Sequence, residues 1–191
     1  MWAKHKQKAG FTIPELLIII VVIGILVSIG LMTYTNIQQR GKNTRTRQAL
    51  SSWIKAIDLY KKDRGTLPNG NACLGTGYAA ASDSDSSNQG QCGHIGASTV
   101  ITESPDFNKI MQPYIRSTPL PTPALVTTKS TNADWLMGIT YSSKDSDSAY
   151  VQAVYAGQLG SCPTVAGVPA TYSTWDSNTN CQYKIRLTAD S

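Results

Sequence analysis

Residues 10–32 read GFTIPELLIIIVVIGILVSIGLM, a nearly unbroken apolar run with a single charged side chain, that of Glu15. The 22 residues from Phe11 to Met32 would form a helix of about 33 Å, close to the hydrocarbon thickness of a bilayer, about 30 Å. A charged residue within a membrane segment costs a few kcal/mol and usually has a function. The position of Glu15 therefore discriminates among the roles that this segment can have.

Three roles compete for residues 11–32. A cleaved secretory signal would use the lysines of residues 1–10 and a small-residue cleavage site at residues 28–30. A permanent single-span anchor would tolerate Glu15 without benefiting from it. Cleavage just before Phe11 would instead create a terminal ammonium, with which Glu15 of a neighbouring copy can pair. Burial would strengthen such a pair, so it would fix the axial register of an assembly.

The sequence GFTIPELLI at residues 10–18, followed by GIL at residues 24–26, resembles the prepilin signature of type IV pilins and pseudopilins. The resemblance covers about 20 residues, with a looser match at the exit of the following helix. It implies that a prepilin peptidase cleaves between Gly10 and Phe11, that Phe11 is then N-methylated, and that Glu15 is the assembly residue. It also implies a long helix packed on a small sheet.

The helical pattern continues through residues 33–64. Apolar side chains recur on one face of this stretch, at Leu50, Trp53, Ile54, Ile57 and Tyr60. Gly65 and Pro68 then form a stop signal for the helix. We expect this amphipathic stem to bury the face that carries Trp53 against a head domain.

Two parts of the long helix are predicted to be weak. Gly41 and the polar run at residues 38–48 favour a bend. Gly24, Ser28 and Gly30 are expected to allow local unwinding during assembly, since each glycine costs about 1 kcal/mol relative to alanine. Close helix–helix packing is the alternative role of these small residues.

The four cysteines lie beyond residue 65, in sequence rich in Ser, Gly and Asn, and they indicate two disulfides formed in an oxidising compartment. Three pairings are open. The equal spacing of nineteen residues favours Cys73 with Cys92 and Cys162 with Cys181. A four-thiolate zinc site is the alternative. The second of these loops is similar to the C-terminal disulfide loop of many pilins.

The remaining sequence predicts the elements of an α+β head. Residues 183–188 alternate apolar and polar side chains, as a half-buried strand does. Residues 151–155 and 135–141 predict two further strands. Residues 106–115 predict a short helix, with Ser104 as its N-cap. The predicted fold is a long N-terminal helix packed on a small antiparallel sheet with two disulfide loops.

Positive charge is concentrated in the stem. Residues 33–64 carry eight basic and two acidic side chains, whereas residues 65–191 carry six basic and nine acidic side chains. The net charge of +5 therefore does not describe a basic globular domain, and a nucleic-acid-binding domain is disfavoured. The basic stem faces lipid headgroups, an acidic neighbour or solvent.

The sequence carries no phosphate-loop, dinucleotide-binding or nucleophile-elbow motif. We expect no enzyme activity, no cofactor and no small-molecule substrate. Asp83 with Asp85, and Asp145 with Asp147, have the two-residue spacing of calcium loops but lack the glycine and distal glutamate of an EF-hand. They are weak calcium candidates, and solvated loops are favoured.

These observations predict four regions: a leader at residues 1–10, which is removed, a transmembrane and filament-core helix at 11–32, an amphipathic stem at 33–64, and a disulfide-containing head at 65–191. The chain is expected to be a structural subunit of a type IV pilus or related filament. The alternative is a single-pass cell-surface protein whose disulfide-bonded head binds a ligand.

The expected partners are further copies of the chain in a helical homopolymer, minor pilins, prepilin peptidase and the pilus assembly machinery. The precursor is expected in the cytoplasmic membrane, with its N-terminus inside and its head exported, and the mature chain in a filament at the cell surface. Lys4, Lys6 and Lys8 favour this orientation, whereas the basic residues of the stem weaken the argument. Adhesion, twitching, DNA uptake and secretion remain open as roles.

Overall fold

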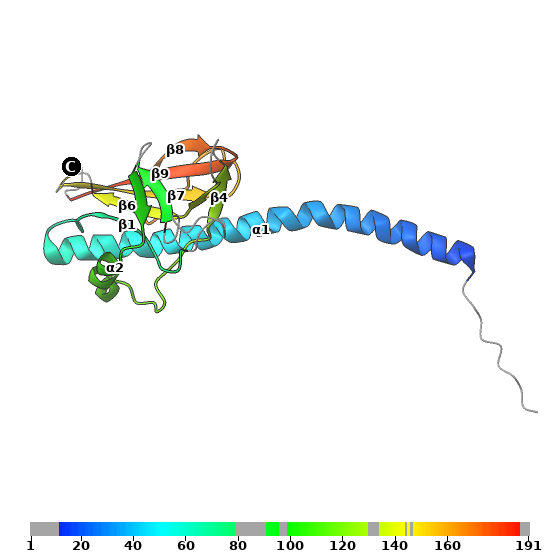
Figure 1. Ribbon diagram of the computed structural model, residues 1–191, viewed down its shortest axis with the longest axis horizontal. Coiled ribbons are helices and arrows are strands. Elements are labelled where there is room, and N and C mark those ends of the chain that lie inside the picture. The colour runs from blue at the N-terminus through cyan, green and yellow to red at the C-terminus, as the bar shows by residue number, and fades with distance from the viewer. Residues whose placement is uncertain are drawn as a thin grey trace, which may run out of the picture. The chain divides into compact units, whose positions relative to one another are not determined.

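The structure is a computed structural model, and it describes residues 12–78, 91–95, 99–129, 134–143, 145 and 147–187. Gly10 and Phe11 of the predicted cleavage site lie outside these residues, as do Asp83 and Asp85. The chain divides into two units, residues 1–38 and residues 39–191. Helix α1 (Ile13–Arg64) provides the described part of the first unit and one layer of the second (Figure 1).

The first unit is helical from Ile13 onward, through Gly24 and Gly30. The Ser28 hydroxyl donates a hydrogen bond to the carbonyl oxygen of Ile25, at 2.7 Å. Within the described part of the chain, no helix combines the length and the apolar character that a membrane crossing requires. The span expected over residues 11–32 includes Phe11, which lies outside the described residues.

The second unit is built on a five-stranded antiparallel sheet, against which the C-terminal part of α1 packs (Figure 1). In spatial order its strands are β1 (Asn71–Cys73), β6 (Ile139–Ser143), β7 (Ser148–Tyr155), β9 (Asn178–Arg186) and β8 (Ala170–Trp175). The α+β class predicted from the sequence is confirmed.

Three smaller elements complete the described part of this unit. One hairpin pairs β2 (Gln91–Ile95) with β3 (Thr99–Thr102), and another pairs β4 (Val126–Lys129) with β5 (Asp134–Met137). Helix α2 (Pro105–Met111) continues into a 3-10 turn, η2 (Gln112–Tyr114).

The core lies between α1 and the sheet. A row of directly opposed residues crosses the strands, with Ala72 opposite Tyr141, Tyr141 opposite Val151, and Val151 opposite Tyr183. All four side chains are fully buried. Facing them, α1 buries the side chains of Ala49, Leu50, Trp53, Ile54, Ala56 and Ile57. Burial of each large apolar side chain contributes about 1.5–3 kcal/mol, so this interface is the main source of head stability.

The end of α1 and the start of α2 form as their sequences predict, whereas the helix expected over residues 106–115 ends as α2 at Met111 and continues as the 3-10 turn η2. Gly65 has a φ of +67°, and its N–H donates to the carbonyl oxygen of Lys61 at 2.9 Å, which closes α1. At the start of α2 the Ser104 hydroxyl accepts a hydrogen bond from the Phe107 N–H, at 3.2 Å.

The single strand predicted over residues 135–141 is wrong, because Gly138 divides it into β5 and β6, which belong to different sheets. The Gly138 N–H donates to the Cys92 carbonyl at 2.8 Å, and its own carbonyl accepts from the Val154 N–H at 3.3 Å. A Cβ atom at this position would lie 2.7 Å from the Tyr78 ring. The close packing of the Tyr78 side chain against this position therefore requires glycine.

Candidate assembly sites

The start of α1 places Glu15 three residues after Thr12. The Glu15 Oε2 atom accepts a hydrogen bond from the Thr12 N–H at 2.8 Å and another from the Thr12 hydroxyl at 2.7 Å. The Thr12 carbonyl accepts from the Leu16 N–H at 3.2 Å, which is the first bond of the helix. Thr12 thus lies at the N-cap position, and the Glu15 carboxylate, three residues later, satisfies the Thr12 N–H, which is one half of a capping box. Pro14 lies in the first turn, where a missing N–H costs little.

Sequence reasoning assigned Glu15 a role but missed its partner Thr12. The Thr-x-x-Glu spacing ahead of an apolar run was the available signal. Both hydrogen bonds end on one oxygen, Oε2. Because a carboxylate offers about four acceptor positions, Glu15 can accept a further donor without losing its cap.

The segment that follows Glu15 exposes apolar side chains on every side of the helix. From Leu16 to Val27 each large hydrophobic residue is between 44% and 65% exposed. A helix that is apolar all around is stable only where other apolar groups surround it, in a membrane or within a helical bundle. This segment is therefore a surface that requires burial, either in a membrane or against other helices.

Trp53 anchors the head to the stem. Its side chain is fully buried, and its Nε1–H donates to the carbonyl oxygen of Pro121 at 2.8 Å. Its ring centroid lies 6.4 Å from that of Phe107 on α2. The prediction that the Trp53 face is buried against the head is confirmed, and the Pro121 carbonyl is a partner that the helical period did not reveal.

The polar run at residues 38–48 is a second attachment to the head. The sequence predicts a bend there, and α1 is helical throughout this run, Gly41 included. Asn43 exchanges two hydrogen bonds with the backbone of Ala156, at 3.0 Å and 2.8 Å. Buried Thr46 donates to the Ala124 carbonyl at 3.4 Å. These contacts stabilise the helix where its sequence lacks apolar residues.

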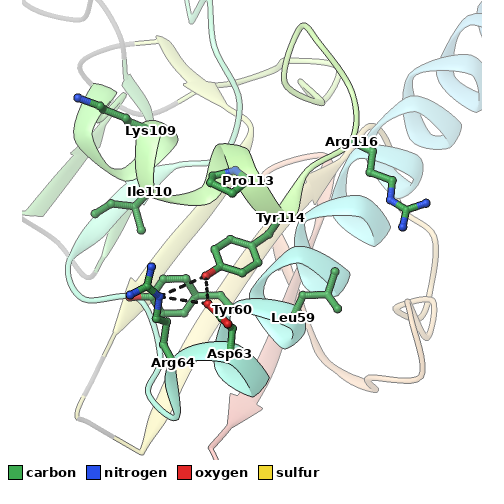
Figure 2. A pocket seen from close by; sticks show the side chains of 9 residues that line it. All are labelled: Leu59, Tyr60, Asp63, Arg64, Lys109, Ile110, Pro113, Tyr114 and Arg116. Atoms are coloured by element: carbon green, nitrogen blue, oxygen red, sulfur yellow. Dashed lines mark hydrogen bonds and ion pairs between the residues drawn. The ribbon is translucent and has the colours of Figure 1, made fainter.

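A groove of about 850 Å³ lies at the C-terminal end of α1, beside α2 and η2 (Figure 2). The Tyr114 hydroxyl donates to Asp63 Oδ2 at 2.5 Å, and the Arg64 Nε atom lies 3.2 Å from the same oxygen. Tyr60 and Tyr114 pack edge to face, with ring centroids 5.3 Å apart. The Asp63 charge is thus partnered within the groove. The lining residues are Leu59, Tyr60, Asp63, Arg64, Lys109, Ile110, Pro113, Tyr114 and Arg116.

The four cysteines form the two local disulfides that their spacing favours, Cys73–Cys92 and Cys162–Cys181. Cys73 and Cys92 are fully buried, in a small cluster with Tyr78 and Ile101. This pairing leaves no thiol for a zinc site.

Asp145 is a turn residue of the β6–β7 hairpin. Its Oδ1 atom accepts from the Asp147 N–H at 3.0 Å, and from the N–H and hydroxyl of Ser148 at 2.6 and 2.9 Å. One carboxylate oxygen is therefore committed to the hairpin's own donors. Among the described residues, no three His, Cys, Asp or Glu side chains come together as a metal-binding group.

Comparisons with known proteins agree with this geometry. A family model of the prokaryotic N-terminal methylation motif matches residues 5–31. Fimbrial protein EcpC of Eikenella corrodens is 36% identical over 72 residues, a match that covers 38% of this chain. The chain spans about half the length of this relative, 46%. No solved structure matches the chain significantly. The N-terminal segment therefore carries a prokaryotic methylation motif, and the resemblance of the chain to the type IV pilin family is confirmed.

Proposed function

We propose that the chain is a structural subunit of a type IV pilus or a related filament at the cell surface. The observation that carries this proposal is the helix of residues 16–27, which exposes apolar side chains all around and follows directly on Glu15. The methylation motif at residues 5–31 and the likeness to a fimbrial protein support the same role.

The assembly mechanism starts from cleavage between Gly10 and Phe11 by a prepilin peptidase, followed by N-methylation of Phe11. The precursor lies in the membrane with its head exported, where the two disulfides form. The mature helices then pack as the core of a filament made mainly of copies of this chain, which also includes minor pilins, and the heads remain outside. Packing against neighbouring helices keeps the apolar surface out of water once the subunit leaves the bilayer, and exposure of that surface would cost about 25 cal/mol per Å².

Glu15 sets the register of the filament in this mechanism. Its carboxylate, already oriented by Thr12, accepts the terminal amine of a neighbouring subunit. An unpaired charge inside the packed helices would cost several kcal/mol, so misregistered subunits are rejected rather than merely bound less tightly. Nothing in this mechanism requires catalysis or a cofactor.

The test is the variant Glu15→Ala, with Asp58→Ala as a matched control, because Asp58 forms exposed ion pairs with Lys61 and Lys62 on the same helix. We expect both variants to be processed to a start at Phe11. Glu15→Ala should lower the yield of sheared filaments at least tenfold, whereas Asp58→Ala should leave it near the wild-type level. A normal filament yield from Glu15→Ala would refute the register mechanism, and an intact Met1 would favour a single-pass surface protein.

A further inference from the structure

A second groove, of about 430 Å³, lies at the other end of the stem–head contact. On α1 it is lined by Arg40 and Arg47, two turns apart on one face of the helix. Opposite them lie Tyr155, at the end of β7, and the loop that carries Leu159 and Ser161. We call it the Arg40–Arg47 groove.

The wall of this groove opposite α1 is fixed by polar contacts. The Gly157 N–H donates to Asn178 Oδ1 at 3.1 Å, and the Leu159 N–H donates to the Thr179 hydroxyl at 2.8 Å. The Asn43–Ala156 pair ties the same loop to α1, and the Cys162–Cys181 disulfide ties it to β9. Because the wall is held in place before any ligand arrives, binding costs little ordering entropy.

The groove is cationic. Arg40 and Arg47 are exposed, and none of the described residues that line the groove is acidic. This distinguishes it from the groove in Figure 2, where Asp63 lies beside Arg64 at 3.2 Å. Ser161 adds a hydroxyl group to the lining, whereas the Thr44 hydroxyl donates to the Arg40 carbonyl and the Tyr155 hydroxyl is paired with that of Tyr183. Guanidinium groups suit a phosphate, which accepts several charge-assisted hydrogen bonds.

The place of Arg40 and Arg47 in the sequence, shortly after the apolar segment, favours a phosphate at a membrane surface. The exposed side chains of Tyr34 and Ile37 continue the apolar surface of the first unit, and tyrosine is enriched at membrane interfaces. In the sequence, Arg40 follows Ile37 by three residues and Arg47 follows it by ten. Helical side chains tilt towards the N-terminus, and long arginine side chains extend to headgroups. Leu159, 44% exposed on the rigid loop, adds an apolar group at the same end.

We propose that the Arg40–Arg47 groove binds the phosphate of an anionic membrane lipid and holds the head against the membrane surface before assembly. The proposal rests on the membrane-held precursor of the proposed function. It gives the basic residues beyond the apolar segment a role: they retain the head at the bilayer until the assembly machinery extracts the subunit.

The test uses the full chain in bilayer nanodiscs of phosphatidylcholine, with or without about one third phosphatidylglycerol. Phenylglyoxal modification of each arginine is followed by mass spectrometry. A basic residue near an anionic surface gains about 1 kcal/mol, so we expect about fivefold slower modification of Arg40 and Arg47 in the anionic discs. Arg45 is the depth-matched control, because it donates to the Thr122 carbonyl at 3.1 Å and lines a different surface. The rate of Arg45 modification should be the same in neutral and anionic discs.

The matched variants are Arg40→Gln with Arg47→Gln, against Arg45→Gln. Anionic discs should slow backbone hydrogen exchange of residues 157–163 in the wild type and in Arg45→Gln, but not in the double variant. The proposal would be overturned if anionic lipid slowed phenylglyoxal modification of all three arginines equally, or of none. It would also be overturned if inorganic phosphate in neutral discs slowed the modification as much as anionic lipid does, or if the slowing required two chains per disc. A chain that fails to enter the discs would overturn it as well.

These measurements need no filament, whereas the Glu15→Ala assay measures filament yield. Failure of the lipid proposal is therefore distinguishable from failure of the proposed function.

Discussion

Glu15 accepts two hydrogen bonds from Thr12, from the backbone N–H at 2.8 Å and from the hydroxyl at 2.7 Å. Cleavage after Gly10 would make Thr12 the second residue of the mature chain. The residue that caps the helix and the residue that pairs with a neighbour would then both be held in the first turn. Thr12 thus orients the carboxylate, and Glu15 supplies the charge.

This division of roles predicts different effects of two substitutions. Thr12→Val removes the hydroxyl but keeps the N–H that reaches Glu15, so the carboxylate stays near its position. We expect normal processing and a filament yield within about threefold of wild type, well above that of Glu15→Ala. Thr12→Ser, which keeps the hydroxyl, is the control and should match wild type. A Thr12→Val yield as low as that of Glu15→Ala would show that the hydroxyl itself is essential.

Trp53 is predicted to be the most sensitive position of the stem–head interface. Trp53→Phe removes the Nε1–H donor of the Pro121 carbonyl, and an unsatisfied partly buried carbonyl costs about 1–3 kcal/mol. Trp53→Ala also leaves a cavity and should lower the free energy of unfolding by about 3–5 kcal/mol. Urea unfolding of the full chain in detergent, followed by circular dichroism, measures both. Leu59→Ala, at a half-exposed position of the same helix, should change stability by less than about 0.5 kcal/mol. Equal effects at the two positions would contradict the predicted interface.

The loop-closure entropy removed by the two disulfides should be similar, because each closes a loop with a sequence separation of 19. The loop-entropy model gives about 3 kcal/mol for each. We expect Cys73→Ala with Cys92→Ala, and Cys162→Ala with Cys181→Ala, each to lower the free energy of unfolding by about that amount. The first pair should cost more than the second, since both of its sulfurs are fully buried and alanine leaves a cavity. A loss below about 1 kcal/mol for the first pair would contradict this account.

Buried tyrosines predict a loss of stability at alkaline pH. Burial raises the pKa of Tyr78, Tyr141 and Tyr183 well above the ordinary value near 10. Above about pH 10 the unfolded chain releases these protons while the folded head retains them. The free energy of unfolding should therefore fall with rising pH, by about 1.4 kcal/mol per pH unit for each such tyrosine. Below pH 9 these groups should cause no pH dependence.

Urea midpoints between about pH 8 and pH 11 test this prediction. Tyr141→Phe should make the free energy of unfolding fall less steeply with pH above about pH 10. At pH 8 the same substitution should lower the free energy of unfolding by about 1–3 kcal/mol, because the Pro68 carbonyl loses its donor. Tyr172→Phe, at a partly exposed position of the edge strand β8, should change stability at pH 8 by less than about 0.5 kcal/mol. Constant stability up to pH 11 would show that these tyrosines are not buried.

Local patterns predicted the helices better than the strands. The period of Leu50, Trp53 and Ile57 and the stop at Gly65 located the stem, and Ser104 located the start of α2. These signals act within a few residues of one another. Strand β8, by contrast, is exposed along most of its length and therefore has no alternating apolar pattern to detect.

Long-range contacts explain the errors that remained. Gly138 divides a strand because backbones from Cys92 and Val154 approach it, a relationship that no local pattern records. Asn43 and Ala156 are 113 residues apart, so the local sequence did not reveal that the polar run is attached to the head. At the candidate site, a single charge within an apolar run was enough to identify Glu15. Its partner Thr12 could have been identified only from the Thr-x-x-Glu spacing of a helix cap.

The proposed assembly depends on cleavage of one bond, between Gly10 and Phe11. Intact-mass and peptide mass spectrometry of the chain, recovered from sheared filaments, shows whether that bond has been cut. We expect a single N-terminus at Phe11 that carries one methyl group on its nitrogen. Recovery of chains that begin at Met1 or at Leu31 would contradict it, because neither places an amine where Glu15 of a neighbour can bind it.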